Sequence, residues 1–563
     1  MLVMAQGQVS VTVDSVGQLS KKIDDKTKFQ ISELTISGPL NGSDIKLIQQ
    51  IVNRSKAKEK NGECLVTSID LSNAIITEGK IGMKLLANEL PNGMFSGAKG
   101  LVKAVLPDGL TAISKDCFSG CSKLVTVPIP SNVTEIENGA FKNCGSLESI
   151  TLPAGLKTIG SEAFEDCESL KAIEIPSGVT KMGSQTFNGC KALATANVLA
   201  NVNELPSAIF SGCNSLSNVS LPSGLNKIGS DAFAKCKALT KIALPESVDE
   251  LGNGAFENCE SLNTIQMASV KKVGNNAFEG CKSLTAVAFN SLSDLGSDAF
   301  KDCQSLKTAN VPGSYKTINN EAFAGCTNLT DITIPSTITE IEDKAFKDCQ
   351  SLAKFAIPTT LEKIGDNVFE NCTTLREAIL PDMLKKMGTG VFKDCTSLDS
   401  VVIGGIIKEL SKETFLNCRS LRSVTLPSAL KEIGTRAFQE CSGLQEISLP
   451  IALQIVGDDA FEKCIALKSI KLPVGVTTIG SDAFLECTSL ASAELSTALK
   501  KIGGEAFAKC PSLRVVKCNS PAAPSISNST FKNSPCMIYV PKGCGTIYRA
   551  HKDWKKMTNI REQ

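Results

Sequence analysis

The pair Phe-x-x-Cys recurs along most of this chain at a nearly constant interval. It begins with Phe118 and Cys121, ends with Phe507 and Cys510, and contains eighteen cysteines. Fifteen of the seventeen intervals between these cysteines are 23 residues long, and two are 22. So short and regular a period predicts a solenoid, in which each unit buries its apolar face only by stacking on its neighbours. One extended array is therefore expected, although the length of 563 residues alone would favour several domains.

The cysteines of this series are expected to be buried and reduced. One Cys occupies the same position in every repeat, so stacking forms a column of thiols spaced by about 4.8 Å. Zinc sites need converging pairs of ligands, and parallel side chains in a column would have to twist to form a disulfide. We expect these thiols to act as small hydrophobic groups and weak hydrogen-bond donors. Outside the series, Cys64 has no other cysteine near it in the sequence. Cys518, Cys536 and Cys544 lie close together, and the sequence does not decide whether two of them form a disulfide.

A single unit, residues 147–169, shows how each repeat is built. Apolar residues alternate over 147–152, as in a short strand, and Pro153 ends that strand. The remainder is too short for a long helix, and Gly160 is expected to adopt a backbone angle that other residues resist. Each unit thus contributes one strand to a parallel sheet and one turn-rich, 3₁₀-like return on the opposite face. Because the strands are closely spaced and the returns bulkier, we expect the sheet on the concave side.

The full repeat reads Leu-x-x-Ile-x-Leu-Pro-x-x-Leu-x-x-Ile-Gly-x-x-Ala-Phe-x-x-Cys from about Leu101 to Cys510. This motif resembles the leucine-rich repeat family, and within it the treponemal or BspA-like class of surface proteins found in Bacteroidetes. The resemblance implies an α+β/β solenoid, namely a leucine-rich repeat superhelix of about 20 repeats of 23 residues. It also implies a parallel concave sheet and short 3₁₀-like or turn-rich convex returns.

The repeat motif and the resemblance together divide the chain into four regions. They are 1–7, a remnant of a signal peptide; 8–94, an N-terminal capping region with longer atypical repeats; 95–518, the leucine-rich repeat solenoid; and 519–563, a degenerate last repeat and C-terminal cap. Residues 3–5 resemble the end of a secretory signal, although chance is the alternative. Within the second region, residues 34–52 predict a strand, a turn, an N-cap and a short amphipathic helix. No stretch approaches the ~20 apolar residues of a membrane span.

The residues that usually carry catalysis are absent or scattered. The 59 basic and 58 acidic residues balance, so no global field favours nucleic acid. The one histidine, His551, lies in the C-terminal cap, and the acidic residues are spread over turns without a distinct glycosidase pair. Phosphate-binding glycine loops and nucleophile elbows are also missing. We therefore expect no enzymatic activity, no cofactor and no metal site.

The variable positions of the sheet remain as the candidate binding surface. The central outward position of each strand is mostly small and polar, and reads Pro128, Thr151, Glu174, Asn197, Ser220, Ala243, Gln266, Ala288, Asn310, Thr333, Ala356, Ile379, Val402, Thr425, Ser448, Lys471, Glu494 and Lys517. Ala356, Ile379 and Val402 are three consecutive apolar residues in this column, and an exposed apolar cluster can mark a partner site. We take these three residues as the ligand-binding candidates, with chance composition as the alternative.

A second candidate surface is the irregular middle of the array. The two 22-residue units between Cys259 and Cys303 lose the Pro-centred turn, and Met267 and Phe289 take the strand-end positions. Tyr315 then replaces a core leucine. Simple drift of the repeat is the alternative explanation.

The resemblance implies a secreted or cell-surface, adhesin-like protein that binds host matrix proteins such as fibronectin, or another cell surface. An extended polar sheet suits a macromolecular partner, most simply a protein, because a small molecule needs a concave pocket. A glycan-capture protein is the first alternative, although the shortage of aromatic residues along the array argues against it. A non-catalytic structural surface protein is the second alternative. The sequence leaves open the identity of the ligand, the coils that bind it and the oligomeric state.

Overall fold

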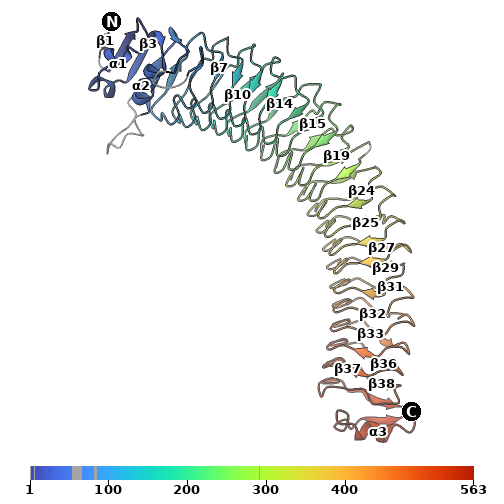
Figure 1. The fold of residues 1–563 in the computed structure, drawn as a ribbon. Coiled ribbons are helices and arrows are strands. Elements are labelled where there is room, and N and C mark those ends of the chain that lie inside the picture. The colour runs from blue at the N-terminus through green and yellow to red at the C-terminus, as the bar shows by residue number, and fades with distance from the viewer. Residues whose placement is uncertain (1, 6, 54–65, 81–84, 291) are drawn as a thin grey trace. The chain divides into compact units, whose positions relative to one another are not determined.

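Two ladders of short parallel strands run through the repeats. The computed structural model describes residues 2–5, 7–53, 66–80, 85–290 and 292–563, which fall into two units, Met1–Leu284 and Thr285–Gln563. In each unit the chain winds as a parallel β-solenoid, and Figure 1 shows its successive coils. The predicted solenoid with a parallel sheet is therefore confirmed.

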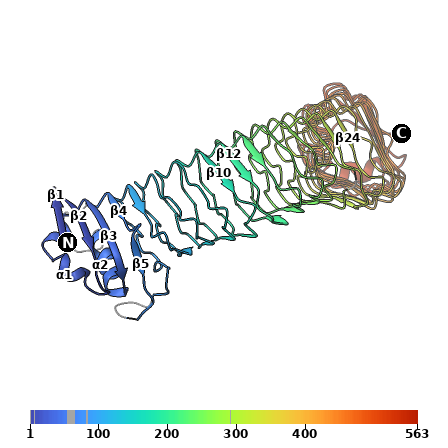
Figure 2. The same cartoon turned by 90° about the horizontal axis from the view of Figure 1, so that it is seen from above.

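The first unit opens with a block of longer elements. Their bounds are β1 (Leu2–Ala5), β2 (Gln8–Thr12), α1 (Leu19–Lys22), the 3₁₀ helix η1 (Thr27–Phe29), β3 (Glu33–Leu40), α2 (Gly42–Val52), β4 (Ser68–Asp70), β5 (Ala74–Ile76) and β6 (Lys103–Val105). The sheet order is β1-β2-β3-β4-β6, with β5 also on β3, and only the β1–β2 pair is antiparallel. Figure 2 shows β1, β2 and β3 side by side, with α2 next to β3.

Helix α2 lies in the segment for which the sequence predicts it, and it begins at Gly42 with Asn41 as its N-cap, slightly earlier than expected. The Asn41 Oδ1 atom accepts hydrogen bonds from the Ser43 and Asp44 N–H groups at 3.0 and 3.3 Å. The Asp44 carboxylate accepts from the Asn41 N–H at 3.1 Å, which completes a capping box. Ile45 and Ile48 are buried on the inner face, so the amphipathic helix predicted for this segment is confirmed.

The first ladder is made by the strands that the alternating apolar residues predict. In the first unit it contains β10 (Ala172–Ile175), β12 (Thr195–Val198), β14 (Asn218–Ser220), β16 (Lys241–Ile242) and β18 (Thr264–Ile265). In the second unit it contains β20 (Ala286–Ala288), β22 (Thr308–Asn310), β24 (Asp331–Thr333), β27 (Glu377–Leu380), β29 (Ser400–Ile403), β31 (Ser423–Thr425), β34 (Ser469–Lys471), β36 (Ser492–Leu495), β38 (Val515–Cys518), β39 (Met537–Val540) and β40 (Ile560–Glu562). Side chains alternate between core and solvent along them, as in the buried Ile173 and exposed Glu174 of β10.

This ladder is interrupted, and residues 147–152 are one of the gaps. Leu147, Ile150 and Leu152 are buried as predicted, yet the segment forms no strand. In the preceding coil Pro128 occupies the central strand position. Proline has no N–H to donate to a ladder, and the coil of Pro128 forms no strand at this position either.

A second ladder, which the sequence did not predict, runs along the other side of the core from the return segments. In the first unit its strands are β7 (Ala112–Ile113), β8 (Glu135–Ile136), β9 (Thr158–Ile159), β11 (Lys181–Met182), β13 (Glu204–Leu205), β15 (Lys227–Ile228), β17 (Glu250–Leu251) and β19 (Lys272–Val273). In the second unit they are β21 (Asp294–Leu295), β23 (Thr317–Ile318), β25 (Glu340–Ile341), β26 (Lys363–Ile364), β28 (Lys386–Met387), β30 (Glu409–Leu410), β32 (Glu432–Ile433), β33 (Ile455–Val456), β35 (Thr478–Ile479) and β37 (Lys501–Ile502). The expectation of one strand per unit is therefore wrong.

The remainder of each return consists of turns closed by i→i+3 hydrogen bonds. In one coil the Cys167 N–H donates to the Phe164 carbonyl at 3.3 Å, and the Leu170 N–H donates to the Cys167 carbonyl at 3.1 Å. The turn-rich return is confirmed, although within the described part of the array these turns do not join into a 3₁₀ helix.

Gly160 does not adopt the unusual backbone angle that the sequence analysis predicted for it. Gly160 does not have a positive φ; a Cβ at this position would lie 2.4 Å from the Asn138 N atom of the preceding coil. The residue is glycine because two backbones approach closely. The left-handed conformation is adopted instead by Glu162 and Asp166, at φ 58° and 55°.

Phenylalanine rings stack along the core of both units. From Phe95 to Phe278 in the first unit, neighbouring centroids lie 4.9–5.7 Å apart. From Phe300 to Phe531 in the second, the spacing is 5.0–5.6 Å. Trp554 contacts Phe531 at 6.4 Å and is fully buried, so it covers the last ring of the stack.

The cysteines of the series are buried free thiols, and the thiol of nearly every one donates to a phenylalanine carbonyl. Cys144 Sγ donates to the Phe118 carbonyl at 3.2 Å, and Cys510 Sγ to that of Phe484 at 3.2 Å. Their expected role as small hydrophobic groups and weak donors is confirmed. Cys518, Cys536 and Cys544 are free thiols as well, and Cys64 lies outside the described residues.

Candidate functional site

Two of the three predicted binding residues meet on the outward face of the second unit. Ile379 on β27 and Val402 on β29 are register partners, with exposed fractions of 65% and 42%. Their chain neighbours Ala378 and Val401 point into the core, so the strand alternation turns both candidates towards solvent.

The third predicted residue, Ala356, lies one repeat earlier. It is exposed, but residues 353–358 form no strand, and no register pair joins Ala356 to Ile379. The structure therefore brings Ile379 and Val402 together and leaves Ala356 outside the hydrogen-bonded sheet.

Sequence reasoning missed two further exposed apolar side chains. Met383 and Ile406 follow Ile379 and Val402 by four residues and are 51% and 65% exposed. The Ile406 N–H donates to the Leu384 carbonyl at 3.1 Å, which holds the two turns together. The 23-residue interval between Met383 and Ile406 places them at equivalent positions of successive turns, and this interval could have revealed them. The prediction considered strand positions and left the turns out. We call Ile379, Met383, Val402 and Ile406 the apolar patch.

A glycine shapes the turn that presents Ile406. Gly405 has φ +85°, and a Cβ there would lie 2.2 Å from the Leu384 carbonyl oxygen. Only glycine fits this close approach of one coil to the next. The turn that holds Ile406 at the surface therefore depends on Gly405.

Polar residues border the apolar patch. Glu377 and Arg376 precede Ile379 and are exposed, and Arg422 forms an ion pair with Asp399 at 3.5 Å in the following coils. An apolar centre inside a polar rim is the usual anatomy of a protein–protein interface.

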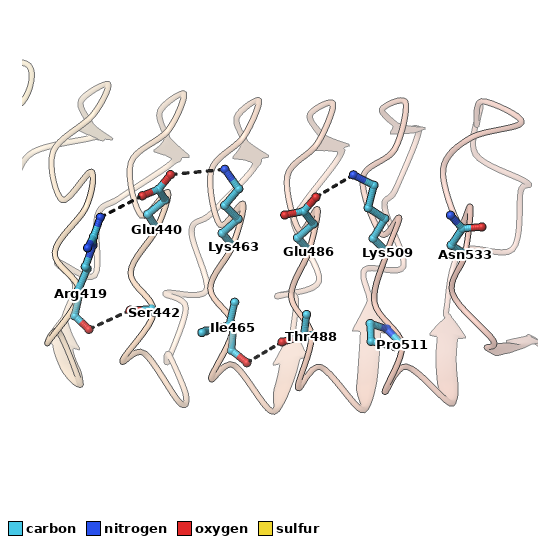
Figure 3. A pocket seen from close by; sticks show the side chains of 10 residues that line it. All are labelled: Arg419, Glu440, Ser442, Lys463, Ile465, Glu486, Thr488, Lys509, Pro511 and Asn533. Carbon is cyan, nitrogen blue, oxygen red and sulfur yellow. Dashed lines mark hydrogen bonds and ion pairs between the residues drawn. The ribbon is translucent and has the colours of Figure 1, made fainter.

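The same unit also contains a groove of about 650 Å³, shown in Figure 3. One wall carries a row of mainly charged residues, Arg419, Glu440, Lys463, Glu486, Lys509 and Asn533, and the other carries Ser442, Ile465, Thr488 and Pro511. Glu440 lies 3.9 Å from Arg419 and 3.4 Å from Lys463, and Glu486 lies 2.8 Å from Lys509. The hydrogen bond from Lys509 lowers the pKa of Glu486. Each of these five charged side chains has an opposite partner in the row, although the three cations outnumber the two carboxylates by one.

The buried thiols of the array are not available as nucleophiles. Burial raises the pKa of Cys259 to about 12 and that of Cys510 to about 11, so both stay protonated near neutral pH. The sequence analysis overlooked Cys117, which directly precedes Phe118 and is fully buried; burial raises its pKa as well. Cys117 fills the position that alanine holds in most repeats.

The single histidine of the sequence is hydrogen-bonded within its own cap. His551 lies in the C-terminal cap, where its Nδ1 atom accepts a hydrogen bond from the Asp553 N–H at 3.3 Å. Within the described ranges no group of His, Cys, Asp or Glu side chains is arranged to hold a metal ion.

The residues of the second candidate surface belong to the core. Met267 and Phe289 are each 2% exposed, and Tyr315 is 8% exposed and donates its hydroxyl hydrogen to the Val311 carbonyl at 3.0 Å. These three side chains fill the interior and offer little surface to a partner. Across the parts of the chain that the structure describes, no helix combines the length and apolar character needed to cross a membrane.

Comparison with known proteins agrees with the repeat motif. The family model described as the BspA type leucine rich repeat region matches residues 88–217, 203–329, 293–422 and 408–538. Comparison with functionally curated proteins finds no match.

Solved structures of bacterial leucine-rich repeat proteins are also similar. A Bacteroides ovatus protein is 24% identical, with 87% of this chain and 90% of that chain covered and a TM-score of 0.28. A Treponema pallidum protein is 35% identical over 29% of this chain and 72% of its own, with a TM-score of 0.25. A leucine-rich cell surface protein of Faecalibacterium prausnitzii is 20% identical over 67% and 86%, with a TM-score of 0.26. The family model covers most of the chain, and on that match the protein belongs to the BspA-type leucine-rich repeat family.

Proposed function

We propose that this protein is a non-catalytic binding protein, secreted or held at the cell surface, that presents the outward face of its first ladder to a protein partner. The observation that carries this proposal is the apolar patch. Four large apolar side chains lie in solvent on adjoining coils, and two of them, Ile379 and Val402, belong to an outward column that is otherwise mostly small and polar. Membership of a repeat family with bacterial surface relatives supports the location.

The chemistry of the patch favours a protein over a small ligand. Ile379 and Ile406 project from a sheet and a turn rather than from the walls of a cavity, so they cannot enclose a small molecule. Apolar side chains at the centre of an interface contribute most when a partner surface excludes water from them. A partner with an apolar cluster of its own and a polar rim would match this surface.

Host matrix proteins are the first partners to test, with fibronectin among them. The full chain would be immobilised and each matrix protein passed over it in a surface plasmon resonance experiment. A double variant, Ile379→Asp with Ile406→Asp, introduces charge into the apolar patch and should weaken binding about tenfold or more. The matched control is Ile451→Asp, because Ile451 is 71% exposed in the same unit and lies outside the patch.

Comparison of the two variants distinguishes binding at the apolar patch from non-specific hydrophobic binding. Equal loss in the patch variant and in the control would contradict the proposed site. A full-length protein that binds none of the matrix proteins at micromolar concentration would contradict the adhesin-like function.

A further inference from the structure

Tyr539 differs from the other two tyrosines of the protein. Tyr315 and Tyr548 are buried, and their hydroxyl groups donate to the carbonyls of Val311 and Ser520 at 3.0 and 2.7 Å. Tyr539 is half-buried on the outward side of β39, and its hydroxyl has no hydrogen-bond partner among the residues that the structure describes. A tyrosine whose polar end lacks a partner is suited to meet a ligand.

Two cations flank this ring along the sheet. Lys517 on β38 and Arg561 on β40 are the register partners of Tyr539, so the three side chains share one face. Parallel strands are spaced by about 4.8 Å, which places one positive charge on each side of the ring. Both cations are exposed, whereas Val516 and Ile560, which directly precede them in the chain, are buried in the core.

The charges of these two residues are not neutralised as charges elsewhere in the array are. Many lysines pair with a carboxylate of an adjacent coil, as Lys171 does with Glu148 at 2.7 Å. Neither Lys517 nor Arg561 forms an ion pair within the described ranges. The acid nearest in register is Glu494, the partner of Lys517, and it pairs with Lys471 on its other side at 3.5 Å.

Two carboxamides extend the same face. Asn519 and Gln563 follow Lys517 and Arg561 by two residues, and the Gln563 Nε2 atom donates to Asn519 Oδ1 at 3.1 Å. Carboxamides both donate and accept hydrogen bonds, so they can bind neighbouring hydroxyl groups. We call Lys517, Tyr539, Arg561, Asn519 and Gln563 the basic–aromatic face.

We propose that the basic–aromatic face binds an anionic glycan, that is, a sugar chain bearing carboxylate or sulfate groups. The negative face of the Tyr539 ring attracts the polarised C–H groups of a sugar ring. Lys517 and Arg561 bind anionic substituents on either side, and arginine holds a carboxylate or sulfate through parallel hydrogen bonds. The carboxamides bind the hydroxyl groups that a sugar carries and an acidic side chain lacks, which favours a glycan over an acidic peptide. This site is separate from the apolar patch and does not depend on it.

Binding of the full chain to defined oligosaccharides tests the proposal. The probes are heparin oligosaccharides, which carry sulfate, oligogalacturonate, which carries only carboxylate, and neutral malto-oligosaccharides. We expect one or both anionic probes to bind and the neutral probe not to bind. Raising the salt from about 50 to about 500 mM should weaken binding because it screens exposed charges. The two anionic probes show whether carboxylate or sulfate is the preferred source of charge.

Single substitutions assign the binding to this face. Lys517→Ala, Arg561→Ala and Tyr539→Ala should each weaken binding about tenfold, whereas Tyr539→Phe keeps the ring and should change it by less than about threefold. Lys431→Ala is the charge-matched control, because Lys431 is exposed and forms no ion pair in the described chain. Thermal unfolding would establish that the variants remain folded.

Three results would overturn the proposal. They are the absence of binding to both anionic probes at about millimolar concentration, binding that the three alanine variants leave unchanged, and equally tight binding of a polyglutamate peptide with the same sensitivity to the variants. The last result would assign the face to acidic peptides. Because none of these variants lies in the apolar patch, failure here would leave the matrix-protein experiment unaffected.

Discussion

Replacing one ring of the phenylalanine stack tests whether the rings stabilise the array through contact with their neighbours. Phe461 is fully buried, and its centroid lies 5.1 Å from that of Phe438 and 5.2 Å from that of Phe484. Truncation of a buried phenylalanine to alanine costs about 3–5 kcal/mol. Leucine keeps much of the volume but removes both aromatic contacts, each of which contributes about 0.5–1.5 kcal/mol. We therefore expect Phe461→Leu to lower the free energy of unfolding by about 1–3 kcal/mol.

Urea unfolding of the full chain, followed by circular dichroism, measures these differences. Phe95→Leu is an internal comparison, because Phe95 is fully buried and, in the described chain, stacks on one ring only, that of Phe118 at 4.9 Å, and it should lose about half as much. A double-mutant cycle of Phe461→Leu with Phe484→Leu should give a coupling energy of about 0.5–1.5 kcal/mol. The same cycle with Phe415, which does not contact Phe461, should give less than about 0.5 kcal/mol. Equal coupling energies in both cycles would refute stabilisation through ring contacts and would mean that the rings contribute only by filling volume.

Two further predictions concern the titratable groups. In the native protein Cys544, which is half-buried, should react quickly with a thiol reagent at pH 8, whereas the 21 buried thiols should react only after denaturation, and Cys544→Ser should remove one rapid equivalent. Denatured protein that still lacks most free thiols would indicate disulfides instead. Burial, and then the neighbouring carboxylates of Asp459 and Glu505, raise the pKa of Asp482, so its charge destabilises the folded state above that pKa. Asp482→Asn should therefore raise the free energy of unfolding at pH 7 by up to about 1 kcal/mol, and the gain should vanish near pH 3. A gain that persists unchanged in acid would contradict this cause.

The repeat made the core predictable from the sequence because its residues are the ones that recur. Phe164 and Cys167 occupy the same two buried positions in each coil, and the outward strand positions follow from the alternation with buried residues such as Ile173. The capping sequence also predicted helix α2 correctly. These inferences rest on the intervals between recurring residues, and such intervals can be read from one sequence alone.

Features set by contacts between coils were not predictable in the same way. Each strand of the second ladder is only two residues long, as in Thr158–Ile159, which is too short to show a period. The reason for Gly160 lies in a backbone atom 22 residues earlier, Asn138 N. Met383 and Ile406 are exposed because a turn points them outward, and the strand pattern says nothing about that turn.

Ion pairs between adjacent coils neutralise many of the surface charges. We therefore expect a partner to bind where the surface differs from the regular repeat. An exposed ion pair such as Lys171 with Glu148 contributes at most about 1 kcal/mol to stability. The 59 basic and 58 acidic residues give a net charge of only +1, and pairing keeps opposite charges close together, so no long-range field arises. A partner must therefore recognise local exceptions, and the two surfaces proposed in the second unit differ in kind. Binding at the apolar patch should persist in high salt, whereas binding at the basic–aromatic face should be lost, so salt alone should separate the two surfaces.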